Sequence, residues 1–286
     1  RRAEFAMYGG VRFGGTLTVD GAFKLGFDHI ALCMGAGRPT IVPMKNGLAR
    51  GVRAASDFLM GLQLTGAAKA DSLANLQIRL PVVVIGGGLT AIDTATEARA
   101  YYPIQVEKFR RRYEALAADE GEAKVRAGWT DEEREVAEEF LAHAKALADP
   151  GADKDKLIDS WGGVTIAYRR RMIDAPSYTL NHEEVEKALE EGIRFAENLS
   201  PVEVEVDLHE HAKAVLFERD GTSVRLPARA VLMAAGTQPN TVLAREMEGR
   251  LELDGKYFRA IDEDGNPVTP ERVSKPATPH VLAAVK

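Results

Sequence analysis

Residues 82–98 read VVVIGGGLTAIDTATEA, and this stretch decides the fold. Four residues that favour β-structure run directly into three glycines, and a segment rich in Ala and Thr with helical character follows. A strand, a tight turn and a helix in this order form the phosphate-binding unit of Rossmann-like folds, where a pyrophosphate sits at the helix N-terminus. The stretch therefore predicts an α/β fold with a nucleotide site at this turn.

The glycines match the dinucleotide fingerprint G-x-G-x-x-G/A as Gly86-x-Gly88-x-x-Ala91. In that pattern Gly86 makes the tight turn, Gly88 lets the backbone touch the phosphates, and Ala91 lets helix and strand pack closely. The unpaired N–H groups and the dipole of the helix favour an anion at its start. A purely structural turn is the alternative. We predict a nucleotide-binding loop made of Gly86, Gly87, Gly88, Leu89, Thr90 and Ala91.

Composition limits the class of protein. A chain of 286 residues is long enough for one large domain or two. No apolar run approaches the roughly 20 residues that a membrane-spanning helix needs, and a net charge of −6 argues against general nucleic-acid binding. The single cysteine, Cys33, excludes an intrachain disulfide and favours a cytoplasmic location. Because it lies in an apolar run, we expect Cys33 to be a buried hydrophobic residue rather than a reactive thiol.

Other stretches predict the surrounding elements. Residues 27–37 (FDHIALCMGAG) predict a buried strand followed by a turn, and residues 51–64 predict a helix. Residues 101–160 are highly charged but keep a helical stripe of apolar residues, which indicates two or three amphipathic helices on the outside of the fold. Alternating segments between 194 and 227, with Asp220-Gly221 at a turn, predict a small β-meander.

The acidic residue that usually follows the glycines by about 20 positions is missing. Residues 106–108 read Val-Glu-Lys, and the next convincing strand is VTIAYRRR at 164–171. We therefore expect residues 101–160 to be an insertion between the first helix and the second strand. Arg169 and Arg170 then take the place of the acid, and two guanidinium groups suit a 2′-phosphate. This favours NADP over NAD, with a solvated strand end as the alternative.

Three further patterns carry weaker signals. His209-Glu210-His211 places two histidines on one strand face, but a metal needs more ligands, so we prefer an exposed loop or strand edge near a hairpin and expect no metal site. The basic run at 108–113 (KFRRRY) suits a phosphate partner or a solvated helix face, and we prefer the second. Trp129 and Trp161 flank the expected insertion, and we expect them to anchor it.

The order of these motifs resembles that in a known family. FDHIALCMGAG, GVRAASDFLMGL, VVVIGGGLTAIDTATEA, VTIAYRRR and VLMAAGTQPN follow one another as in the small subunit of bacterial glutamate synthase and its relatives among the pyridine nucleotide-disulfide oxidoreductases. The resemblance implies that NADPH gives a hydride to FAD, and that electrons leave toward an iron–sulfur or amidotransferase partner. It matches Tyr168, Arg169 and Arg170 to the family's nucleotide-selecting strand end. It assigns no catalytic side chain, because the protein's task is to position two rings.

The resemblance also implies a domain arrangement, with an NAD(P)-binding domain inserted into an FAD-binding domain. Residues 81–236 would form the NAD(P)-binding domain, and residues 1–80 and 237–286 would form a partial, truncated FAD-binding domain. Gly35 and Gly236 would lie where the chain crosses between the two.

Three features depart from the family pattern. Nothing before residue 27 supplies the strand–GxGxxG–helix unit of an FAD domain, and no Gly-Asp segment follows VLAAVK at the C-terminus. Residues 101–160 are also longer than in compact members. We therefore expect an inactive fragment of a longer flavoenzyme, which binds NADPH but lacks FAD and whose partner is the remainder of the FAD domain. A docking or regulatory module that keeps the Rossmann fold without turnover is the alternative.

Overall fold

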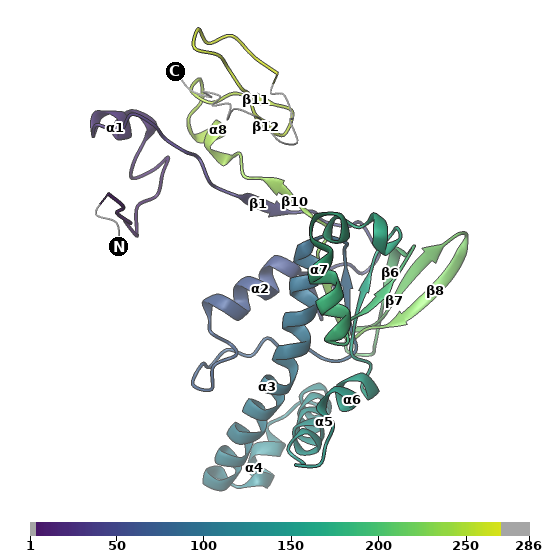
Figure 1. The fold of residues 1–286 in the computed structure, drawn as a ribbon. Coiled ribbons are helices and arrows are strands. Elements are labelled where there is room, and N and C mark those ends of the chain that lie inside the picture. Colours follow the sequence, from purple (N-terminus) through teal and green to yellow (C-terminus); the bar gives the residue numbers. More distant parts are fainter. Residues whose placement is uncertain (1–3, 270–286) are drawn as a thin grey trace. The chain divides into compact units, whose positions relative to one another are not determined.

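The computed structural model describes residues 4–269, which divide into two compact units (Figure 1). The first unit contains the chain up to Arg38 and from Thr237 onward, and the second runs from Pro39 to Gly236. The first boundary differs from the one expected after residue 80. Residues 39–80 belong to the same unit as 81–236, because they contribute a strand and a helix that pack into its core.

The second unit is built on a parallel sheet of five strands in the order β2-β9-β3-β4-β5. At its centre β3 (Val82–Ile85) lies between β9 (Ala230–Met233) and β4 (Val164–Ala167), while β2 (Val52–Ala54) and β5 (Arg194–Ala196) form the edges. Every residue of β3 is buried, as in strands that are covered on both faces. The predicted α/β, Rossmann-like fold is thus confirmed.

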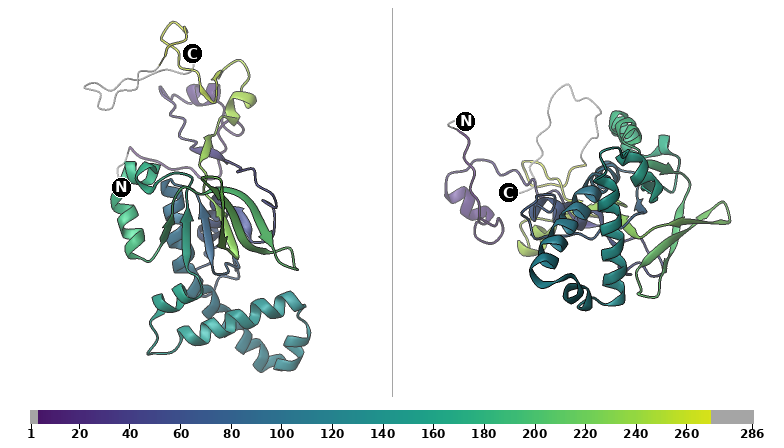
Figure 2. Two further views of the ribbon diagram at one scale, coloured as in Figure 1. Left: turned by 90° about the vertical axis from the view of Figure 1, so that its right-hand side faces the viewer. Right: turned by 90° about the horizontal axis from the view of Figure 1, so that it is seen from below.

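Helices cover one face of this sheet (Figures 1 and 2). Val82 and Val84 point to that face, because alternate residues of a strand face opposite sides. Its helices are α2 (Ala55–Leu64), α3 (Leu89–Glu120) and α7 (Pro176–Glu190). Phe58 and Leu62 of α2 are buried in the same core, as their helical spacing predicts.

An antiparallel meander covers the other face, where Val83 and Ile85 meet a second apolar cluster. It consists of β6 (Ser200–Val206), β7 (Ala212–Arg219) and β8 (Thr222–Pro227). Asp220 and Gly221, between β7 and β8, have φ values of 49° and 77°. Positive φ at both turn residues is the type I′ geometry that favours an Asp-Gly hairpin, so the predicted meander is confirmed.

The charged segment 101–160 is helical, as predicted, but no new helix begins at its first residue. α3 continues past the expected end near Ala100 to Glu120, and then α4 (Glu122–Ala127), α5 (Asp131–Leu147) and α6 (Lys154–Ser160) follow. None of the helices that residues 4–269 form is long and apolar enough to cross a bilayer.

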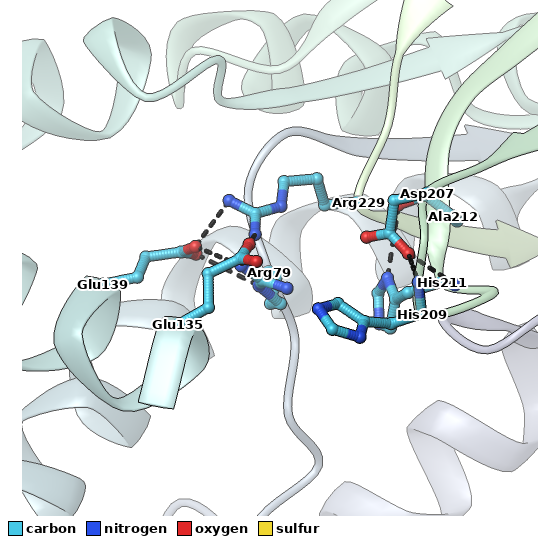
Figure 3. A network of polar contacts seen from close by, with 8 residues as sticks. All are labelled: Arg79, Glu135, Glu139, Asp207, His209, His211, Ala212 and Arg229. Carbon is cyan, nitrogen blue, oxygen red and sulfur yellow. Dashed lines mark hydrogen bonds and ion pairs between the residues drawn. The ribbon is translucent and has the colours of Figure 1, made fainter. Parts of the chain in front are cut away.

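A partly buried ion-pair network fixes α5 to the sheet (Figure 3). The Arg79 side chain is only 1% exposed and lies 2.6 Å from Glu139 and 3.0 Å from Glu135. Arg229 pairs with the same two glutamates. Since Arg79 and Arg229 shortly precede β3 and β9, the network holds α5 at the amino ends of these strands.

The described part of the first unit has little regular structure. Its elements are α1 (Val19–Lys24), β1 (Ala36–Pro39) paired with β10 (Thr237–Pro239), α8 (Val242–Glu246), and β11 (Leu253–Asp254) paired with β12 (Tyr257–Phe258). The strand predicted for residues 27–37 is wrong: β1 starts only at Ala36, and Cys33 is exposed rather than buried. Within residues 4–269 the apolar run has no neighbouring strand to satisfy its backbone. The VLAAVK segment, after which a Gly-Asp segment is missing, lies outside the described residues.

Candidate functional site

A cavity of about 680 Å³ opens in the second unit at the carboxyl ends of the parallel strands. Ile85, Ala167 and Ala234 line it at the ends of β3, β4 and β9. From β3 the chain crosses to β4 on one side, and β9 lies on the other side. Open parallel sheets bind their ligands outside the carboxyl ends of the strands, where the strand order reverses. The predicted glycine loop lies at this point.

The two outer glycines of the loop have different surroundings. A Cβ on Gly86 would lie 2.3 Å from the carbonyl oxygen of Ala234, so the loop and the end of β9 pack too closely for a side chain. A Cβ on Gly88 would meet nothing within 4 Å, so the backbone there is open to approach from the cavity. Gly88 is the N-cap of α3 and provides no side-chain cap, which leaves the first N–H groups of the helix for an anion. A pyrophosphate therefore fits this cradle.

Of the remaining residues of the predicted loop, some lie at the cavity and one lies in the core. Thr90 lines the cavity, whereas Leu89 is half-buried beside it. Ala91 is 1% exposed and packs against the sheet, the role that its place in the fingerprint predicts. On another wall lies Gly236, with φ at 93°. Gly35 belongs to the first unit, where it precedes β1 instead of ending a strand.

The arginine run after β4 is not uniform. Tyr168 and Arg169 line the cavity, but Arg170 does not. Arg171 forms a bidentate ion pair with Asp174, at 2.9 and 3.1 Å, and this hydrogen-bonded pair holds the pKa of Asp174 below its usual range. Among residues 4–269, Arg169 is therefore the member of the run that both lines the cavity and has no ion-pair partner.

Two parts of the cavity carry no sequence motif. The loop 40–43 and the segment 199–201, which includes the start of β6, form a mostly apolar wall although they lie far apart in the chain. Pro176 contributes from the first turn of α7. The sequence did contain a signal for Pro176. Proline is common at the first position of a helix, so it marks the start of a helix shortly after the arginine run.

The two histidines of the HEH pattern lie elsewhere, in the tight turn between β6 and β7 (Figure 3). The Asp207 carboxylate accepts hydrogen bonds from the backbone N–H groups of His209 and His211. His211 directly precedes β7, near the hairpin as expected, but it is only 5% exposed, so the expected exposure is wrong for this residue. The turn packs against residue Arg50, whose carbonyl accepts from Ala212. Within the described residues no group of three or more His, Cys, Asp or Glu side chains is arranged for a metal ion.

A model of the pyridine nucleotide-disulphide oxidoreductase family matches residues 7–272. The chain belongs to this family. Its members are oxidoreductases that bind FAD and a pyridine nucleotide.

Individual relatives match over part of their length. A protein of Rickettsia prowazekii, "Uncharacterized protein RP006", is 38% identical over 286 positions, which cover 91% of this chain and 39% of that protein. An FAD-dependent pyridine nucleotide-disulphide oxidoreductase from Desulfovibrio vulgaris matches 84% of this chain and 43% of its own at 17% identity and a TM-score of 0.42. The thioredoxin reductase of T. acidophilum matches 82% and 52%, at 14% identity and a TM-score of 0.43. The chain thus spans well under two thirds of these proteins.

Proposed function

We propose that this chain binds NADPH in the cavity of the second unit and delivers its hydride to FAD within a longer, cytoplasmic flavoenzyme. The proposal rests on one observation: the open glycine loop, the uncapped start of α3 and Arg169 all lie at the same cavity. We also propose, on the order of the sequence motifs, that electrons then pass to an iron–sulfur or amidotransferase partner, as in the small subunit of glutamate synthase.

Different residues of the cavity bind different parts of NADPH. The first N–H groups and the dipole of α3 hold the pyrophosphate at Gly88. Arg169, beyond the end of β4, makes charge-assisted hydrogen bonds to the 2′-phosphate. The apolar wall of 40–43 and the segment 234–236 lie on the β9 side, where they orient the nicotinamide and exclude water.

FAD supplies the acceptor for the hydride when it is bound. We assign it to the first unit as part of an FAD-binding domain. The residues described there do not fit an FAD site by themselves, since they contain no strand–glycine loop–helix unit. No side chain of this chain is therefore assigned to the flavin.

Nucleotide titration with charge-reversal variants tests the proposal. Arg169→Glu is expected to weaken NADPH binding at least tenfold, because a charge-assisted hydrogen bond contributes about 1.5–3 kcal/mol. NADH, which lacks the 2′-phosphate, should lose much less. Arg170→Glu should have a smaller effect, since Arg170 does not line the cavity.

Lys187→Glu is the matched control, because it changes the net charge equally at the other end of α7 and should leave both affinities unchanged. Equal losses of NADPH and NADH in Arg169→Glu would remove the selectivity. If the unmodified chain binds neither nucleotide, the alternative of a docking or regulatory module is favoured.

A further inference from the structure

The middle glycine of the loop needs an explanation of its own. In the fingerprint G-x-G-x-x-A this position is open to any residue. Gly87 is also not among the glycines with positive φ, so its backbone conformation does not require glycine. A Cβ on Gly87, however, would lie 2.5 Å from Cδ2 and Cε2 of Tyr168 and 2.7 Å from Cζ. The requirement comes from an aromatic ring that lies directly against the Gly87 backbone.

The backbone of Tyr168 cannot easily retreat from this contact. Its N–H donates to the carbonyl of Ala196 at 2.9 Å, and its carbonyl accepts from the N–H of Leu199 at 2.9 Å. Tyr168 directly follows β4, which is paired on both sides. A side chain at position 87 would therefore have to be accommodated by rotation of the ring out of its place in the cavity wall.

Gly87 is held from a second direction by the start of α7. Its carbonyl accepts a hydrogen bond from the N–H of Ser177 at 3.0 Å. Tyr168 and Ser177 lie at the two ends of the connection between β4 and α7, and Arg169 belongs to this connection. The glycine loop is thus joined to both ends of the segment that carries the free arginine.

We propose that Gly87 and Tyr168 interlock to position Arg169, so that Tyr168 is a specificity-determining residue for NADPH over NADH. This inference rests on the proposed function. Through the interlock, the pyrophosphate part and the 2′-phosphate part of the cavity keep one fixed spacing. Because the backbone of Tyr168 is held, displacement or loss of the ring opens the cavity wall beside Arg169, and the Arg169 side chain is then no longer fixed opposite the 2′-phosphate. Only NADPH has a phosphate at that place, so the loss falls mainly on NADPH.

A double-mutant cycle on the full chain tests the interlock, with the dissociation constants of NADPH and NADH as readout. Gly87→Ala and Tyr168→Ala are each expected to weaken NADPH binding about tenfold and NADH binding much less. The double variant should bind NADPH as well as Tyr168→Ala alone, because the added Cβ then has no ring to displace. Tyr168→Phe should keep the preference, since the Tyr168 hydroxyl has no hydrogen-bond partner among residues 4–269.

Gly88 provides the matched control within the same loop. Gly88→Ala adds the same methyl group where no protein atom lies within 4 Å, so it does not disturb Tyr168. The methyl group would face the pyrophosphate, which both nucleotides share, so binding of NADPH and NADH should weaken equally. Two results would overturn the interlock. In the first, the losses of NADPH affinity in Gly87→Ala and Tyr168→Ala multiply in the double variant. In the second, each variant loses as much affinity for NADH as for NADPH.

Thermal unfolding without nucleotide separates this proposal from the proposed function. Gly87→Ala should lower the melting temperature, and added Tyr168→Ala should cancel that loss. If Gly87→Ala does not fold, the ratio of NADPH to NADH affinity in Tyr168→Ala and Tyr168→Phe still tests whether Tyr168 determines specificity. If the unmodified chain binds neither nucleotide, the proposed function fails and the specificity role fails with it. If it binds both and Tyr168→Ala keeps the preference, the interlock alone is wrong.

Discussion

Single glycines in the phosphate loop differ in what a methyl group would meet. At Gly86 it would meet the carbonyl oxygen of Ala234 at 2.3 Å, and this backbone atom directly after β9 cannot rotate away as a side chain can, because the Ala234 N–H donates to Ile85. Gly86→Ala is therefore expected to destabilise the chain by about 2–3 kcal/mol, as overpacking in a core does. Gly88→Ala should cost only about 0.5–1 kcal/mol, through a poorer N-cap. Denaturant unfolding of the two variants would measure this, and equal costs would contradict the packing argument.

At the scale of elements, the junction of α3, α5 and α6 includes a histidine with an unusual environment. The ring of His143 stacks on Trp161, with centroids 3.7 Å apart, and its Nδ1 lies 2.5 Å from the Tyr102 hydroxyl. Burial lowers the pKa of His143 from its ordinary 6.5 to about 4. The unfolded chain therefore takes up this proton first, and the His143 contribution makes the fold less stable as the pH falls from about 6.5 to about 4.

We expect His143→Gln to remove this part of the pH dependence. The free energy of unfolding of both proteins would be measured between pH 7 and pH 4, and the difference between them isolates His143 from the carboxylates. A difference that stays constant over this range would contradict the assignment.

Elements with their own local signals were predictable, and those that depend on distant partners were not. VVVI with its glycines, the Asp-Gly hairpin and the stripe on α5 each carry a period or a turn that sets their structure. By contrast, the apolar run at 27–37 has the composition of a strand but no neighbour among the described residues. α3 was expected to end near Ala100, yet it passes through Pro103 because α5 and α7 pack along it.

The same distinction applies to the candidate site. The loop and Arg169 were predictable because a spacing and a strand end mark them. The ring of Tyr168 against Gly87 was not predictable as a contact, because residues 81 positions apart meet only through the pairing of β3 with β4.

In the second unit as a whole, the cavity and α5 lie at opposite ends of one sheet. The cavity lies at the carboxyl ends of β3, β4 and β9, and the Arg79–Glu139 network lies before the amino ends of β3 and β9. Glu139→Ala leaves the Arg79 guanidinium buried with a weaker partner, so it should destabilise the chain by about 3 kcal/mol. The ratio of NADPH to NADH affinity should not change, because distant sites contribute independently.

Glu138→Ala is the control on the same helix. Its side chain is 57% exposed, so its removal should cost less than about 0.5 kcal/mol. Unfolding and nucleotide titration on both variants would check this. A changed nucleotide preference in Glu139→Ala would contradict the separation of the two ends.

The unbroken course of α3 has a consequence for motion. One helix of 32 residues, about 48 Å long, carries the glycine loop at its start and the inserted helices along its second half. The chain returns to β4 through Gly162, where a Cβ would lie only 2.3 Å from Pro81, so the return is tightly packed as well. The segment that follows Ala100 is thus continuous with α3 at its start and packed against Pro81 at its end. We therefore expect a displacement of α4, α5 and α6 to bend the helix whose first turn faces the cavity.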